Sequence, residues 1–182
     1  LFTPPQPSPP VPSEAADISV IICTRGRVEM LRGCLRALAS QTQPPREIIV
    51  VDNAPQDTRT VEVAREFGVQ YAREDRPGLD FARNCGLHAA TSAVVAYVDD
   101  DARPAADWVA ALARAFRNQA VDVVTGLVAP AELATREQFL FEWEYGGMGH
   151  GFDRRLYRRD LLTTSALLWA SGLGWCALHY TV

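Results

Sequence analysis

The chain has 182 residues, of which 48% are hydrophobic and 22% are charged, a composition typical of one globular domain with a full core. Its formal net charge is −4 and it contains no long basic run, so no nucleic acid is expected as a partner, because a phosphate backbone needs a basic face. The four cysteines and three histidines do not have zinc-ligand spacing, which favours small buried thiols in a reducing cytosol over a zinc site.

Residues 1–16 are predicted to form a disordered leader, because prolines crowd the first 13 positions. The leader lacks the basic and apolar stretches of a signal peptide. The chain also begins without Met, which leads us to expect an incomplete start. Residues 17–151 are predicted to form a single domain.

Within this domain, short apolar runs alternate with helical patterns. Strands are predicted at residues 18–23, 47–51, 69–72, 93–98 and 122–128. Helices are predicted from apolar stripes at residues 28–40, 58–67, 81–90 and 107–118. This alternation predicts an α/β fold, a Rossmann-like, mostly parallel sheet with helices on both faces.

Polar residues follow three of the predicted strands. Thr24 and Arg25 follow the first strand, Asp52 follows the second, and residues 99–101 (Asp-Asp-Asp) follow the fourth. Ligands of parallel sheets bind outside the carboxyl ends of the strands. The sequence therefore predicts a binding site at this edge of the sheet.

The acidic triplet, Asp99, Asp100 and Asp101, is the sharpest of these features. Adjacent carboxylates repel one another, and removing them from water is costly unless a cation compensates. Mg²⁺ or Mn²⁺ prefers such oxygen ligands and would in turn bind a diphosphate. The alternative is a solvated or helix-capping cluster; the position directly after a buried strand favours the metal.

The other polar segments leave two readings each. Asp52 could accept a hydrogen bond from a pyrimidine base, or it could form a plain turn. Residues 24–27 could bind phosphate or base through backbone N–H groups, a hydroxyl and the guanidinium groups of Arg25 and Arg27, or they could form a simple turn. Arg83 and Asn84 open a helix near the acidic strand end, where Arg83 either holds a carboxylate or diphosphate or is an incidental surface residue.

Four segments, ISVIICTRGR, EIIVVDN, PGLDFARNCGL and AYVDDDARPAADW, occur in this order. Together they resemble the signature of family-two glycosyltransferases with the glycosyltransferase-A fold, and the likeness extends from about Ile18 to Gly151. The resemblance implies that Asp99, near the ribose, and Asp101 hold Mg²⁺ or Mn²⁺ at the diphosphate. It also implies a set of nucleotide-binding residues: Thr24, Arg25, Arg27, Asp52, Arg83, Asn84, Asp99 and Asp100.

The implied activity is transfer of a sugar from a nucleotide-diphosphate sugar, expected to be a UDP-sugar, to a saccharide or lipid acceptor. Transfer would proceed with inversion, in cell wall or exopolysaccharide biosynthesis. Such an enzyme needs a general base, but the sequence departs from the family pattern after residues 152–155, and no catalytic residue is assigned. We therefore expect a chain truncated before the acceptor and base region, and the alternative is an inactive fragment that binds nucleotide and metal.

Two other enzyme classes fit poorly. A phosphatase of the Asp-x-Asp type would want Thr or Val where this chain has Arg103. A nicotinamide-dependent dehydrogenase would need a Gly-x-Gly-x-x-Gly motif after the first strand, and that motif is missing from the sequence.

Residues 152–182 form a divergent tail. Its last 22 residues, 161–182, contain no Asp, Glu, Lys or Arg and follow four arginines, which makes them a candidate membrane span. Their Thr, Ser and Gly content favours instead a buried segment or an abnormal terminus. The expected location is the cytoplasm, at the inner face of the cell membrane if the tail does span it.

Overall fold

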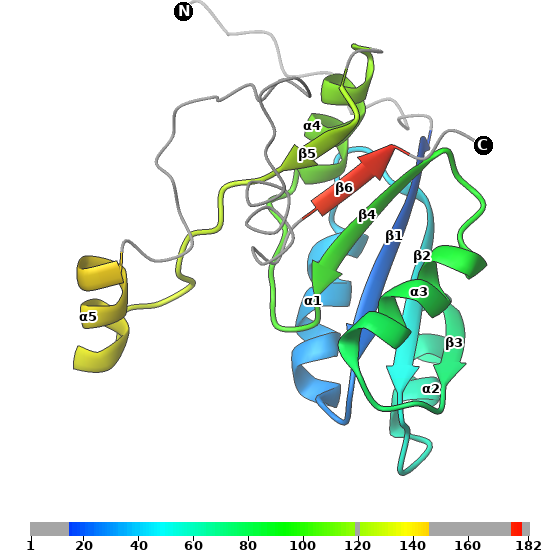
Figure 1. Ribbon diagram of the computed structural model, residues 1–182, viewed down its shortest axis with the longest axis horizontal. Helices are drawn as coiled ribbons and strands as arrows, with labels where there is room; N and C mark the ends of the chain where they lie inside the picture. The colour runs from blue at the N-terminus through cyan, green and yellow to red at the C-terminus, as the bar shows by residue number, and fades with distance from the viewer. Residues whose placement is uncertain (1–14, 119–120, 146–175, 180–182) are drawn as a thin grey trace, which may run out of the picture.

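The computed structural model describes residues 15–118, 121–145 and 176–179 (Figure 1). The secondary-structure elements in chain order are β1 (Ala16–Thr24), α1 (Val28–Ala39), β2 (Pro45–Asn53), α2 (Arg59–Glu66), β3 (Gln70–Glu74), α3 (Leu79–Ala89), β4 (Val94–Asp99), α4 (Trp108–Phe116), β5 (Val123–Thr125), α5 (Arg136–Tyr145) and β6 (Cys176–His179). The strands and helices predicted between residues 18 and 118 are all present, with ends that differ by at most a few residues.

The strands form one sheet in the order β3-β2-β1-β4-β6-β5. The first four strands in this order are parallel, whereas β6 is antiparallel to both β4 and β5. The mostly parallel α/β fold is thus confirmed. The run predicted at residues 122–128 is a strand only over Val123–Thr125, and its partner is β6, from a tail in which no strand was predicted.

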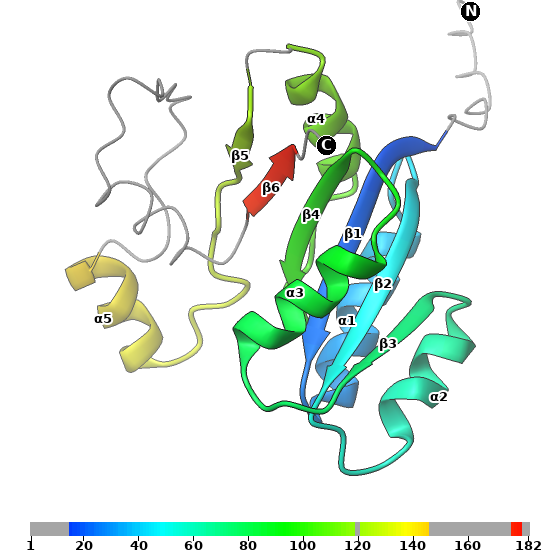
Figure 2. The same cartoon turned by 45° about the vertical axis from the view of Figure 1, so that its right-hand side comes forward.

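Helices cover both faces of the sheet (Figure 2). On one face, α1, α2 and α4 pack on alternate residues of the strands, such as Val20 and Ile22 of β1. On the other face, α3 packs through Ala82 on Ile21 and its neighbours in β2 and β4. Because successive strand residues point to opposite faces, a continuous apolar run is what a strand buried on both sides requires.

Helix α3 lies very close to β1. A Cβ atom built on Gly86 would overlap Cγ2 of Ile21 and would lie 3.1 Å from Cγ2 of Val51. Only a residue without a side chain therefore permits this distance between helix and sheet. The contact fixes the position of α3, which begins at Leu79 beside the carboxyl ends of the strands.

Helix α5 stands apart from the sheet in Figure 1. Among the described residues, no helix is long and apolar enough to cross a membrane. The candidate span at residues 161–182 falls outside the described part, apart from 176–179 in β6. The predicted leader likewise lies outside it up to residue 14, and β1 begins at Ala16, inside the predicted leader.

Candidate functional site

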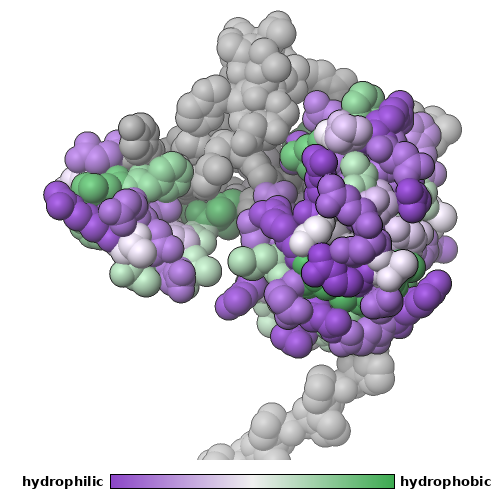
Figure 3. Space-filling view, turned by 90° about the horizontal axis from the view of Figure 1, so that it is seen from below, coloured by the Kyte–Doolittle hydropathy of each residue, from purple (hydrophilic) through white to green (hydrophobic). Residues whose placement is uncertain are grey.

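The carboxyl ends of the parallel strands place the predicted site residues next to one another. In the register of the sheet, Thr24 of β1 pairs with Asp52 of β2, and Cys23 pairs with Asp99 of β4. Figure 3 views the molecule from the end toward which these strands point, and the surface there is mainly hydrophilic. Residues that lie far apart in the sequence thus converge on one polar edge, as the rule for parallel sheets predicted.

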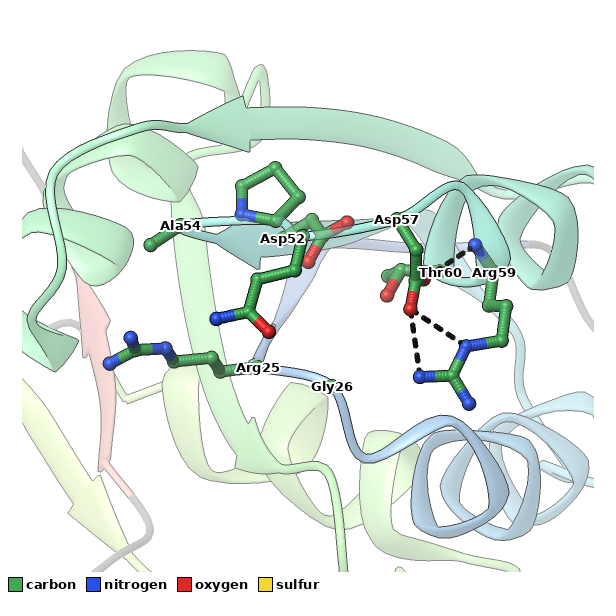
Figure 4. A pocket seen from close by; sticks show the side chains of 9 residues that line it. Arg25, Gly26, Asp52, Ala54, Asp57, Arg59 and Thr60 are labelled. Atoms are coloured by element: carbon green, nitrogen blue, oxygen red, sulfur yellow. Dashed lines mark hydrogen bonds and ion pairs between the residues drawn. The ribbon is translucent and has the colours of Figure 1, made fainter.

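A cavity of about 220 Å³ opens between the end of β2 and the loops after β1 and β2 (Figure 4). An ion pair between Asp57 and Arg59 borders it on the α2 side, with an oxygen–nitrogen distance of 2.8 Å. Arg25, on the loop after β1, borders it as well. The residues that line the cavity are Arg25, Gly26, Asp52, Ala54, Pro55, Gln56, Asp57, Arg59 and Thr60.

Asp52 is the most deeply buried acid of this cavity, with 1% of its surface exposed. The hydroxyl of Tyr71 donates a hydrogen bond of 3.2 Å to Oδ2, whereas the buried Oδ1 has no hydrogen-bond partner in the structure. Burial raises the pKa of Asp52, and the hydroxyl of Tyr71 and the nearby hydroxyl of Thr60 oppose that rise only in part; Thr60 makes no hydrogen bond of ordinary geometry to Oδ1. A buried acceptor without a partner is costly, so this oxygen is suited to receive a donor from a ligand in the cavity.

The carboxylates of the acidic triplet differ in burial and in contacts. Asp100 is completely buried, and its Oδ2 accepts hydrogen bonds from the hydroxyl of Thr24 at 2.6 Å and from Nε of Arg27 at 3.1 Å. Nη2 of Arg27 pairs with the other oxygen of Asp100. Asp101 instead has half of its side chain exposed and contacts Nη1 of Arg27 at 3.1 Å. Asp100 therefore makes its contacts inside the protein, whereas Asp101 is partly exposed to solvent.

Burial raises the pKa values of both Asp99 and Asp100. For Asp99, the neighbouring charge of Asp101 adds to the rise, and the guanidinium of Arg83 opposes it. For Asp100, the hydrogen bond from Thr24 and the charge of Arg27 oppose the rise. Burial is thus the main cause of both raised pKa values, and the charge of Asp101 adds to each of them, which is a setting that an added cation would relieve.

The residues present fit a metal that takes most of its ligands from phosphate and water rather than from the protein. Within the described residues, no group of three or more His, Cys, Asp or Glu side chains is arranged to hold a metal by itself. Asp99 and Asp101 supply carboxylate oxygens at one strand end, and Mg²⁺ or Mn²⁺ commonly binds through one or two carboxylates plus phosphates and water. The site thus fits a metal bound together with a diphosphate.

The turn between β3 and α3 is held by polar contacts of Asn53, Glu74 and Arg76, none of which is among the predicted site residues. The side-chain amide of Asn53 donates to the backbone oxygen of Arg76 at 2.7 Å and accepts from the backbone N–H of Gly78 at 2.9 Å. Glu74 accepts from both the backbone and the side chain of Arg76, which lowers the pKa of Glu74 to about 2. The guanidinium of Arg76 also lies 4.4 Å from the ring centre of Phe81.

These contacts fix the turn that leads into α3. Gly78 adopts a φ of 142°, a conformation that side chains rarely tolerate. The sequence held one signal for this arrangement, because Asn53 and Glu74 each end a strand, where a side chain can reach the next loop.

Of the predicted α3 residues, Arg83 is close enough to Asp99 for its charge to oppose, in part, the rise in the pKa of that carboxyl group. The backbone oxygen of Arg83 also accepts a hydrogen bond of 3.1 Å from the hydroxyl of Tyr97. Asn84 is exposed on α3 and does not line the cavity beside Asp52. Its contact with a nucleotide stays a prediction, as does that of Asp100.

Comparison with known proteins agrees with this arrangement. Residues 19–168 match the model of the family described as Glycosyl transferase family 2. Glucosyl-dolichyl phosphate glucuronosyltransferase of Haloferax volcanii is 30% identical over 151 residues, which make up 76% of this chain and 48% of that protein. The chain spans about half the length or less of the curated relatives it matches.

Two solved structures share the fold. Mannosyltransferase PcManGT of Pyrobaculum calidifontis, in complex with GDP-Man and Mn²⁺, is 26% identical with a TM-score of 0.52, over 69% of this chain and 39% of that one. Glucosyl-3-phosphoglycerate synthase of Mycobacterium tuberculosis, in complex with Mn²⁺, UDP and glucosyl-3-phosphoglycerate, is 15% identical with a TM-score of 0.58, over 90% of this chain and 57% of that one. The second likeness concerns the fold alone.

Proposed function

The chain belongs to glycosyl transferase family 2, and from that premise we propose that it binds a UDP-sugar with a divalent metal. In this proposal the sugar is transferred with inversion to a saccharide or lipid acceptor. The observation that carries the proposal is the unpartnered, buried Oδ1 of Asp52 beside a cavity at the carboxyl edge of the sheet. An N–H group of a base would supply the donor that this oxygen lacks.

Each end of the bound nucleotide would meet a different part of the site. The base would lie in the cavity against Asp52, with Arg25 at its border. The diphosphate would lie toward Asp99 and Asp101, which are the residues that would hold Mg²⁺ or Mn²⁺. When bound, the metal would stabilise the negative charge on the departing nucleoside diphosphate.

The chain's own residues prepare the site for this charge. Thr24 and Arg27 hold Asp100 inside the protein, so the carboxylates on either side of it, rather than Asp100 itself, would bind the metal. Asn53 and Glu74 fix the turn before α3, and α3 in turn carries Arg83 near Asp99. We assign no general base to the residues described.

The comparisons support a sugar nucleotide as the donor and leave the base and acceptor to experiment. The Pyrobaculum enzyme was solved with GDP-Man and Mn²⁺, so a guanine nucleotide is the main alternative to UDP. The Haloferax relative is named for a glucosyl-dolichyl phosphate substrate, which agrees with a lipid-linked acceptor.

Calorimetric titration of UDP and of GDP, each with and without Mn²⁺, tests the proposal. We expect micromolar binding of UDP that depends on Mn²⁺ and that weakens at least about tenfold in Asp101→Asn. The matched control is Asp17→Asn, an exposed aspartate at the opposite end of the sheet that pairs with Arg46, and it should bind like the wild type. Tighter binding of GDP would reassign the base, whereas a folded protein that binds neither nucleotide would refute the proposal.

A further inference from the structure

The guanidinium of Arg27 joins two carboxylates of the acidic triplet. Nε and Nη2 contact the two oxygens of Asp100, while Nη1 lies 3.1 Å from Oδ2 of Asp101. Arg27 ends the loop after β1 and directly precedes α1. One arginine from the β1 side of the sheet thus supplies positive charge to the end of β4.

We propose that Arg27 acts as a resident cation at Asp101, so that a divalent metal binds there in competition with it. This inference rests on the proposed metal site at Asp99 and Asp101. It goes further because it predicts that free metal binds weakly and that the diphosphate is needed to offset the charge of Arg27.

The two contacts of Arg27 differ in strength. Asp100 is completely buried and is also bonded to Thr24, so breaking its pair with Arg27 would leave a buried charge without its partner. Arg27 and Asp101 have 54% and 50% of their side chains exposed, and exposed ion pairs contribute little to stability. Arg27 therefore releases Asp101 far more easily than Asp100.

An arginine that stays anchored to Asp100 remains beside any metal bound at Asp101. Two neighbouring cations repel each other, which lowers the affinity for metal alone. A diphosphate carries negative charge and can bind to both the metal and the guanidinium. The geometry therefore makes Arg27 a positioning residue that couples the binding of metal to the binding of nucleotide.

Binding of Mn²⁺, followed through the electron paramagnetic resonance signal of the free ion, tests this coupling with and without UDP. Without UDP, we expect Arg27→Gln to bind Mn²⁺ about three- to tenfold more tightly than the wild type, because a competing charge is gone. Adding UDP should raise the Mn²⁺ affinity of the variant by a smaller factor than it raises the Mn²⁺ affinity of the wild type.

Arg32→Gln is the matched control, because Arg32 lies on α1 but pairs with Glu29 and Glu66. It should change Mn²⁺ affinity by less than about twofold. Asp101→Asn added to Arg27→Gln should abolish the tighter binding. If circular dichroism shows that Arg27→Gln does not fold, Arg27→Lys replaces it, since an ammonium group lacks the planar fork with which Arg27 binds both oxygens of Asp100 and also reaches Asp101, and the expected tightening is about twofold.

Three results would overturn the inference in distinguishable ways. Equal Mn²⁺ affinity in the wild type and the arginine variant would leave the metal site standing and remove Arg27 as its competitor. Tighter binding that survives Asp101→Asn would place the metal elsewhere. No Mn²⁺ binding in any variant, with UDP present, would refute the proposed metal site and this inference with it.

Discussion

Strand β2 carries one carboxylate near each of its ends, and the two have opposite surroundings. Near the amino end, Glu47 accepts hydrogen bonds from the side chains of Ser19, Gln70 and Thr91 and from the backbone N–H of Thr91, at 2.5 to 2.8 Å. Near the carboxyl end, Asp52 accepts one bond from Tyr71, and its Oδ1 has no hydrogen-bond partner. The first carboxylate is saturated by the protein, and the second is not.

The pKa values follow this difference. Burial raises the pKa of Glu47, but the hydrogen bonds from Ser19, Thr91 and Gln70 outweigh it, so the pKa lies below its ordinary value. For Asp52, burial prevails over its hydrogen bonds and the pKa is raised. The amino end thus uses a carboxylate to hold strands and loops together, whereas the carboxyl end keeps a buried carboxyl group with an unpartnered oxygen, at some cost in stability.

The largest effect on stability is expected at the amino end. Glu47→Ala removes the acceptor shared by Ser19, Gln70 and Thr91, and we expect it to lower the free energy of unfolding by about 2 kcal/mol. Urea denaturation measures this, with Glu29→Ala as control because Glu29 is exposed and pairs only loosely with Arg32. UDP binding should be unchanged; a Glu47 variant as stable as the control would erase the contrast between the two ends.

At the carboxyl end, replacing the acid should not lower the free energy of unfolding. Asp52→Asn removes a buried charge while its amide oxygen can still accept from Tyr71, so we expect the free energy of unfolding to stay constant or rise by up to about 1 kcal/mol. UDP binding should weaken at least about tenfold. Urea denaturation and calorimetry measure the two quantities. A variant that is clearly less stable yet binds UDP normally would make Asp52 a structural acid like Glu47.

The two acids should also respond to pH in opposite directions. The lowered pKa of Glu47 gives stability that is present above its ordinary value of 4.5 and is lost as the pH falls through the lower value in the folded state. The raised pKa of Asp52 gives stability that is present below 3.8 and is lost as the pH rises through its higher folded value.

Urea denaturation of the wild type, Glu47→Gln and Asp52→Asn between about pH 3 and pH 7 tests this. The loss in free energy of unfolding of Glu47→Gln relative to the wild type should vanish toward low pH. Any gain in free energy of unfolding of Asp52→Asn should vanish there as well. If Glu47→Gln lost the same free energy of unfolding at every pH, the hydrogen bonds to Glu47 would not depend on the charge of its carboxylate.

The smallest effect is expected from a surface pair at the amino end. Nη1 of Arg46 lies 2.8 Å from Oδ1 of Asp17, and 59% of each side chain is exposed. Arg46→Ala should change the free energy of unfolding by less than about 0.5 kcal/mol, since exposed ion pairs contribute little. A loss comparable to that of Glu47→Ala would show that the amino end depends on surface charge as well as on its internal network.

The sequence was sufficient for the parallel sheet and for the edge of the sheet at which the candidate site residues meet. Apolar runs such as residues 18–23 require burial on both faces, and in a parallel sheet the residues that follow them meet at one edge. The separate roles of Asp99, Asp100 and Asp101 were not predictable, because three identical side chains differ only in which of them the turn buries. The partner of β5 was also missed, since β6 comes from an apolar tail with no strand pattern of its own.

Close packing at Gly86 makes this position a test of how tolerance to substitution should be interpreted. Gly86 touches Ile21 and Val51 rather than the cavity, yet any side chain there would lift α3 off the sheet and carry Arg83 away from Asp99. In a saturation-mutagenesis screen for donor binding, position 86 would therefore behave like a binding residue. The screen would be detecting the distance between a helix and a strand.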